Sequence, residues 1–197
     1  MWCIEMKNRT IIAIVGIPGS GKTSLANKLS SELAGIPVLN TDIVKAAYED
    51  ENPQILSKVS HNAWELMGSY SELNVKEGYT LFSKTLFRYT YSLAKKLLNT
   101  YTTVIIEGMG IDIPALSDIE EDVICIFLTN DNIEKSYLDK LKYRVNKINN
   151  WEIRKDILKI IEKKLYENYR IIVISKHFDI HQDQNAIDFV KFHLGKE

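Results

Sequence analysis

The chain has 197 residues, of which 45% are hydrophobic and 26% charged, and its formal net charge is −1. This length and composition suit a single globular domain. The balanced charge gives no electrostatic case for general nucleic-acid binding. No apolar stretch approaches membrane-spanning length, and the first ten residues lack the apolar core of a signal peptide. The two cysteines form neither a metal-binding spacing nor a disulfide framework, so we expect a cytoplasmic protein.

The first predicted strand, residues 10–15, is an apolar and β-branched run that is typical of a buried parallel strand. It is followed by the pattern G-x-x-x-x-G-K-T and then by a helix with leucines at spacings of four. Strand, glycine loop and helix in this order predict a phosphate-binding P-loop. The predicted nucleotide-binding residues are Gly16, Pro18, Gly19, Ser20, Gly21, Lys22, Thr23 and Ser24.

Each part of the P-loop has an expected role toward the predicted cofactors, ATP and Mg²⁺. Glycines let backbone N–H groups turn around phosphate oxygens, and the helix N-terminus adds partial positive charge. Lys22 is expected to reach the β- and γ-phosphates, as a catalytic residue, and the Thr23 hydroxyl to bind Mg²⁺.

A second predicted strand, residues 36–39, precedes the triplet Asn40-Thr41-Asp42. Ligands of open α/β sheets gather beyond the carboxyl ends of the strands, so Asp42 is a candidate to face the γ-phosphate. It would bind Mg²⁺ through water or accept the proton of an acceptor hydroxyl. The alternative is that Thr41 or Asp42 simply caps the helix that follows.

The stretch 48–78 is the least regular of the chain and is the predicted place of a substrate-binding insertion. A long helix over 79–97 and a strand over 102–106 follow it. The strand leads into Glu107, at a position where P-loop proteins carry an acidic residue, usually Asp. Glu107 is expected to order the water shell of Mg²⁺ or to act as the base, and the alternative is a solvated carboxylate.

A fourth strand, residues 123–128, precedes a helical region over about 132–150. Lys140, Arg144 and Lys147 share one face of this helix. The region is a candidate lid, with Arg144 closing over the ATP phosphates; an ordinary solvated face is the alternative.

The next helix carries Arg154 on the same line as Leu158, Ile161 and Leu165. An arginine on an apolar face needs an anionic partner, either a phosphate or a buried carboxylate, and the phosphate makes Arg154 a candidate catalytic residue. The last strand is predicted over 170–174, which places His177 after it as a candidate contact of the adenine.

Alternating strands and helices predict a three-layer α/β/α fold in which helices cover both faces of a parallel sheet. We expect one domain over 1–197, with the insertion and the lid as its additions.

Several segments together resemble a known family. The P-loop, the Thr41-Asp42 pair, Ile105-Ile106-Glu107-Gly108 and the helix around Arg154 occur in an order similar to that of P-loop small-molecule kinases of the nucleoside-monophosphate-kinase type. The segments look most like those of archaeal 2-phosphoglycerate kinase. The resemblance implies a five-stranded sheet in the order 2-3-1-4-5 and an arginine at position 154.

The leading functional hypothesis is an ATP-dependent kinase that phosphorylates a hydroxyl of a small metabolite, with 2-phosphoglycerate as one candidate. A nucleotide, nucleoside or polynucleotide-end kinase is the alternative enzyme. A non-catalytic nucleotide-binding regulator is the alternative of another class. A guanine-specific switch is not favoured, because the segment 129–132 lacks the lysine of an N-K-x-D motif.

Overall fold

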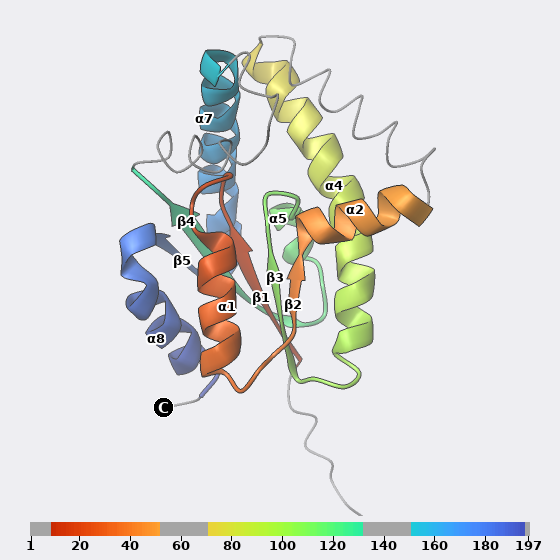
Figure 1. Cartoon of the computed structure of the whole chain (residues 1–197), viewed down its shortest axis with the longest axis vertical. Coiled ribbons are helices and arrows are strands. Elements are labelled where there is room, and N and C mark those ends of the chain that lie inside the picture. Colours follow the sequence, from red (N-terminus) through yellow and green to blue (C-terminus); the bar gives the residue numbers. More distant parts are fainter. Residues whose placement is uncertain (1–8, 52–70, 132–150, 196–197) are drawn as a thin grey trace, which may run out of the picture.

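A computed structural model describes residues 9–51, 71–131 and 151–195 of the chain. Five parallel strands form one sheet in the order β2-β3-β1-β4-β5 (Figure 1). The order implied by the family resemblance is thus confirmed. The strands are β1 (Thr10–Val15), β2 (Val38–Asn40), β3 (Thr103–Glu107), β4 (Asp122–Thr129) and β5 (Ile174–Asp179).

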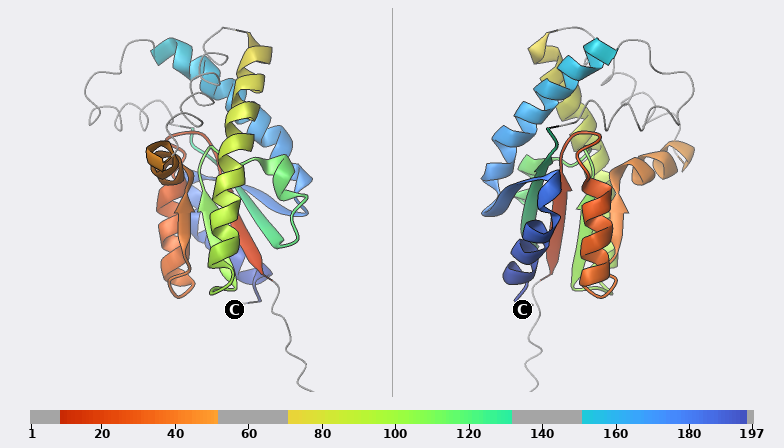
Figure 2. Two further views of the ribbon diagram at one scale, coloured as in Figure 1. Left: turned by 90° about the vertical axis from the view of Figure 1, so that its right-hand side faces the viewer. Right: turned by 60° about the vertical axis from the view of Figure 1, so that its left-hand side comes forward.

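Helices cover both faces of this sheet (Figures 1 and 2). On one face lie α1 (Lys22–Glu32) and α8 (Asp183–His193). On the other lie α4 (Glu72–Leu97), α5 (Ile113–Leu116) and α7 (Trp151–Asn168). The helix α2 (Thr41–Glu51) starts directly from β2, and the short 3₁₀ helices η1 (Tyr169–Ile171) and η2 (Ile180–Gln182) flank β5. This is the predicted three-layer α/β/α architecture.

The strand β1 lies at the centre of the sheet and supplies both cores. Successive side chains of a strand point to opposite faces. Ile12 and Ile14 accordingly pack under α1 and α8, whereas Ile11, Ala13 and Val15 pack under α4 and α7. All six residues of β1 are buried, as its continuous apolar sequence predicts.

Of the predicted strands that the structure describes, the last differs most from its predicted position. Residues 169–171 form η1, and Val173, in the predicted strand, is 99% exposed. The strand β5 lies at the edge of the sheet, paired with β4 from Ile174 to Asp179. In β5 only Phe178 is fully buried, so the strand lacks the apolar run by which the inner strands were identified.

Two helices begin or end inside the stretch 48–78. The helix α2 extends to Glu51, and α4 starts at Glu72, where the Ser71 hydroxyl accepts a hydrogen bond of 3.1 Å from the backbone N–H of Asn74. The middle of the predicted insertion, 52–70, lies outside the described residues. So does the whole of the predicted lid, 132–150.

Within the described part of the chain, no helix is both long and apolar enough to cross a membrane. The thiol of Cys125 lies inside β4, and burial raises its pKa to about 12. This thiol therefore has no reactive thiolate at neutral pH and serves as core packing.

Candidate functional site: the P-loop and the carboxyl ends of β1 to β4

The loop 16–21 connects β1 to α1 and requires glycine at specific points. A Cβ on Gly16 would collide with the carbonyl oxygen of Leu128 at the end of β4. Gly21 adopts a left-handed backbone (φ 89°), and a Cβ there would lie 2.7 Å from the Ile180 side chain. The glycines of the motif thus let the loop approach two neighbouring elements closely, which fixes its shape.

Two carbonyl groups of this loop are held by side chains. The Lys22 ammonium donates to the carbonyl of Ile17 at 2.8 Å, and Lys22 is itself buried. The side-chain amide of Asn130, which follows β4, donates to the carbonyl of Gly19 at 3.0 Å. These hydrogen bonds hold the shape of the loop at the start of α1, where the N–H groups of a helix N-terminus can bind an anion.

Glu107 ends β3 beside the P-loop and is 1% exposed. Its Oε1 accepts a hydrogen bond of 2.9 Å from the hydroxyl of Thr23. The same oxygen accepts a hydrogen bond from the side-chain amide of Asn40 at the end of β2. The structure therefore brings together two of the three predicted metal ligands, Thr23 and Glu107. The alternative of a solvated strand-end carboxylate is wrong.

Asn40 also organises the start of α2. Its Oδ1 accepts hydrogen bonds from the backbone N–H groups of Asp42, at 2.8 Å, and Ile43, at 3.0 Å. This is the capping role that the sequence left open for Thr41 or Asp42, and the structure gives it to Asn40. The Asp42 side chain is exposed, and within the described residues no hydrogen bond or ion pair joins it to the P-loop.

Thr41 has an unusual hydroxyl. The residue is fully buried, yet within the described part of the chain its Oγ1 has no hydrogen-bond partner. It packs against Gly108, where any Cβ would overlap this oxygen. A buried hydroxyl without a partner costs stability.

The remaining predicted residues have different outcomes. Arg144 lies outside the described residues. Arg154 lies in the first turns of α7, and its side chain is outside the described part, although Leu158, Ile161 and Leu165 on the same line are buried as predicted.

His177 does not follow the last strand but lies inside β5, where its Nε2 is 2.8 Å from the Thr129 hydroxyl. Its ring lies 5.3 Å from the ring of Phe127. The residue that follows β5 and meets the P-loop is Ile180, beside Gly21. The displacement of His177 follows from the error in the position of the last strand.

The arrangement suits a magnesium–nucleotide complex. Mg²⁺ usually keeps several waters and binds one or two carboxylates together with phosphate oxygens. One hydroxyl, Thr23, and one buried carboxylate, Glu107, adjoining an anion-binding loop meet this requirement. The described residues contain no cluster of three or more His, Cys, Asp or Glu side chains, which a metal held by protein alone would need.

Asn40, Thr41 and Asn130 were not among the predicted site residues. Asn40 and Asn130 both follow a strand directly at the carboxyl edge of the sheet. Their place in the sequence was therefore a usable signal, whereas the missing partner of Thr41 is visible only in three dimensions.

Comparisons with known proteins support the fold. No family model matches the sequence, and no curated protein sequence matches it. Among solved structures, a candidate kinase from Chloroflexus aurantiacus J-10-fl is similar with a TM-score of 0.59 and 17% identity, over 96% of this chain and 98% of that one. Thymidylate kinase from Candida albicans is similar with a TM-score of 0.54 and 14% identity, over 96% of this chain and 94% of that one. A gluconokinase from Sinorhizobium meliloti 1021 is similar with a TM-score of 0.52 and 15% identity, over 95% of this chain and 92% of that one.

These likenesses span nearly the whole of both chains in each case, at identities that establish the fold alone. The chain has the α/β/α fold of the P-loop kinases, with the sheet order that the resemblance implies.

Proposed function

We propose that the protein is an ATP-dependent phosphotransferase that moves the γ-phosphoryl group of ATP to a hydroxyl of a small metabolite. The observation that carries the proposal is the complete P-loop with Thr23 hydrogen-bonded to the buried Glu107. A P-loop followed by an acidic residue at the end of β3 is the arrangement that holds the phosphates and Mg²⁺ in this class of enzyme.

Mg²⁺, when bound, would neutralise charge on the β- and γ-phosphate oxygens. Lys22 stabilises the negative charge that grows on the transferred group, and the N-terminus of α1 adds its partial charge. Thr23 and Glu107 would hold the Mg²⁺ that accompanies the nucleotide. In the transfer, the acceptor oxygen bonds to the γ-phosphorus, the bond to the β–γ bridging oxygen breaks, ADP leaves, and the acceptor proton moves to a carboxylate.

We assign that proton to Asp42. It is exposed at the start of α2, whereas Glu107 already accepts two hydrogen bonds through one oxygen and lies deep in the site. A base must reach a substrate that arrives from solvent, so the exposed carboxylate suits this role better.

The proposal also covers the two arginines, the position of the adenine base, the cellular location and the acceptor. Arg154 and Arg144 would bind phosphate, and the base of ATP would lie near Ile180 and His177 around β5. We place the activity in the cytoplasm. The middle of the predicted substrate-binding insertion, 52–70, lies outside the described residues, so 2-phosphoglycerate stands as one candidate acceptor beside a nucleoside monophosphate.

The test is transfer from γ-labelled ATP with Mg²⁺ to a panel of acceptors. The panel contains glycerate, 2-phosphoglycerate, nucleosides, nucleoside monophosphates and 5′-hydroxyl RNA. We expect label on a small hydroxyl compound and none on RNA. Binding of ATP without transfer to any acceptor would favour the non-catalytic regulator, and label on RNA alone would favour the end kinase.

A further inference from the structure

A hollow of about 160 Å³ lies between α4, α5 and the second half of α7. Tyr79, Thr80, Ser83 and Lys84 of α4 form one side, and Lys164 and Leu165 of α7 form another. The segment 111–114, which follows β3, closes the third. No residue of the P-loop lines the hollow, and neither do Asp42 and Glu107, so it is separate from the site described above.

Asp112 is the feature of the hollow that ordinary core packing does not explain. The residue is only 7% exposed, and its carboxylate makes no hydrogen bond with the residues that the structure describes. It precedes α5 without capping it. Burial raises the pKa of Asp112, against the opposing effect of Lys84 and Lys164. Among the described residues, Thr41 Oγ1 is the fully enclosed side-chain atom without a partner, so the Asp112 oxygens are accessible from the hollow. A ligand that donates a hydrogen bond to them would offset the cost of placing this carboxylate among buried residues.

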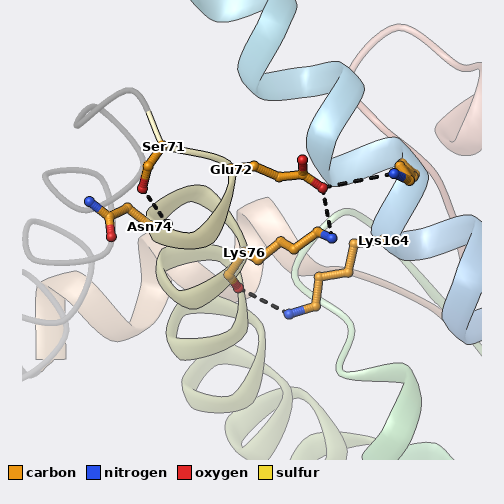
Figure 3. A network of polar contacts seen from close by, with 6 residues as sticks. Ser71, Glu72, Asn74, Lys76 and Lys164 are labelled. Atoms are coloured by element: carbon orange, nitrogen blue, oxygen red, sulfur yellow. Dashed lines mark hydrogen bonds and ion pairs between the residues drawn. The ribbon is translucent and has the colours of Figure 1, made fainter.

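Two ammonium groups face the same space. Lys84 is exposed, which places it at the mouth of the hollow, and it forms no ion pair with any residue in the described ranges. Lys164 reaches across from α7 to α4, where it donates to the carbonyl of Lys76 at 3.0 Å (Figure 3). It also donates to the Thr80 hydroxyl. An ammonium has three N–H donors, so one donor of Lys164 is left for a ligand.

The neighbouring charges of α4 and α7 are satisfied in a different way. Near the N-terminus of α4, Glu72 pairs with Lys76 at 2.8 Å and with Lys163 of α7 at 3.8 Å (Figure 3). Ion pairs therefore join α4 and α7 near the N-terminus of α4. Around the hollow, by contrast, Asp112 and the two lysines line one space without pairing with one another.

This charge pattern selects one chemical class of ligand. A metal ion is disfavoured by the two ammonium groups, and a simple anion is disfavoured by Asp112. A molecule that carries an ammonium and a carboxylate satisfies both, with its ammonium on Asp112 and its carboxylate toward Lys84 and Lys164. A cavity of about 150 Å³ holds a molecule the size of benzene, which limits the ligand to roughly five to eight non-hydrogen atoms. The apolar walls, Ile111, Ile113 and Leu165, suit its short carbon skeleton.

We propose that this hollow is a second binding site, for a small α-amino acid or a zwitterion of the same size. The site is connected to the nucleotide side through the chain itself. Five positions separate Asp112 from Glu107, and the Tyr79 hydroxyl holds the intervening carbonyl of Met109 at 2.8 Å. No P-loop residue lines the hollow, so its ligand is a second ligand of the protein and not the phosphoryl acceptor.

The test is isothermal titration of the full chain, without nucleotide, with glycine, alanine, serine, β-alanine and proline. Lactate and ethanolamine, which lack the ammonium or the carboxylate, are the ligand controls. We expect at least one amino acid to bind, and each control compound to bind at least about tenfold more weakly. The variants Asp112→Asn and Lys84→Met should each weaken binding by about tenfold or more.

Lys96→Met is the matched control, since Lys96 is exposed on the same helix and does not line the hollow. It should bind as the wild type does, and so should Lys22→Ala, which alters only the P-loop. The absence of binding by any amino acid of the panel would overturn the proposal. So would equal binding by lactate, unchanged affinity in both hollow variants, or loss of binding in Lys22→Ala. Because ATP is absent, the outcome does not depend on the proposed kinase activity.

Discussion

Glu107 and Asp112 are both buried carboxylates and lie five positions apart, yet their surroundings differ completely. Glu107 receives hydrogen bonds from Thr23 in the first turn of α1 and from Asn40 at the end of β2. Asp112 receives none from the described residues and has only the longer-range attraction of Lys84 and Lys164. On the nucleotide side, hydrogen bonds from neighbouring side chains thus hold the carboxylate in place. In the hollow, the carboxylate and the two lysines form no ion pair with one another.

The comparison leads to different expectations for the two regions. Substitutions around the P-loop should affect turnover strongly and stability little, because the hydrogen bonds there orient groups for phosphoryl transfer. Substitution of Asp112 should leave turnover intact and improve stability, because the carboxylate is buried at a cost.

The largest effect is expected for Lys22→Ala. Removing a well-placed cation from a transferring phosphoryl group costs on the order of 3 kcal/mol, or at least about 10²-fold in turnover. The measurement is label transfer from ATP to the best acceptor, with thermal unfolding to show that the variant is folded. Lys28→Ala, on the exposed side of the same helix, is the control and should keep its activity. A folded Lys22→Ala variant with wild-type turnover would refute the kinase assignment.

The next comparison separates the two carboxylates of the site. Asp42→Asn should lower turnover by on the order of 10²-fold with little change in the affinity for ATP, because it removes the proposed base. Glu107→Gln should instead raise the Mg²⁺ concentration needed for half-maximal activity. Turnover measured against both ATP and Mg²⁺ distinguishes these results. If the two phenotypes are exchanged, Glu107 is the base and the assignment of Asp42 is wrong.

Asn130→Ala should have a smaller effect on the same site. The variant loses the hydrogen bond to the carbonyl of Gly19, and one such bond is worth about 1 kcal/mol, or roughly fivefold in the KM for ATP. Asn27→Ala, exposed on α1, is the matched control. An unchanged KM would show that the P-loop keeps its shape without Asn130.

The smallest effect concerns stability around the hollow. Asp112 faces Lys84 of α4, Lys164 of α7 and Asp118 beyond α5, and burial raises its pKa above the ordinary value of 3.8. The folded chain therefore holds this proton more tightly than the unfolded chain, so stability falls as pH rises from about 4 through the raised pKa. Asp112→Asn should unfold at a slightly higher temperature than the wild type at pH 7, and the gain should shrink near pH 4.

Melting temperatures of the two proteins between pH 4 and 8 test this expectation. A lower melting temperature of Asp112→Asn at pH 7 would mean that the carboxylate is stabilised by partners after all. That result would remove the contrast with Glu107.

The sequence predicts the central part of the molecule well, and the reasons are physical. The inner strands β1 and β4 are buried on both faces, so their apolar runs identify them. The edge strand β5 is half exposed and was misplaced, which also misplaced His177. The P-loop is recognisable because its glycines are required locally, by backbone shape and close approach.

The parts of the site that were missed depend on contacts between distant segments. The bond between Asn130 and Gly19 joins residues 111 positions apart, and Asn40 meets Glu107 across 67 positions. The buried Asp112 resembles any loop aspartate in the sequence. Only the packing of α4 and α7 against the segment after β3 makes it a candidate binding residue.

The central claim is that the P-loop, with Thr23 hydrogen-bonded to the buried Glu107, binds the magnesium complex of ATP. Amide hydrogen–deuterium exchange, with and without Mg²⁺ and a non-hydrolysable ATP analogue, tests it most directly. The account predicts slower exchange over residues 16–24 in the wild type but not in Lys22→Ala, with little direct change at 79–84. Unchanged exchange over 16–24, or protection confined to the hollow, would contradict it.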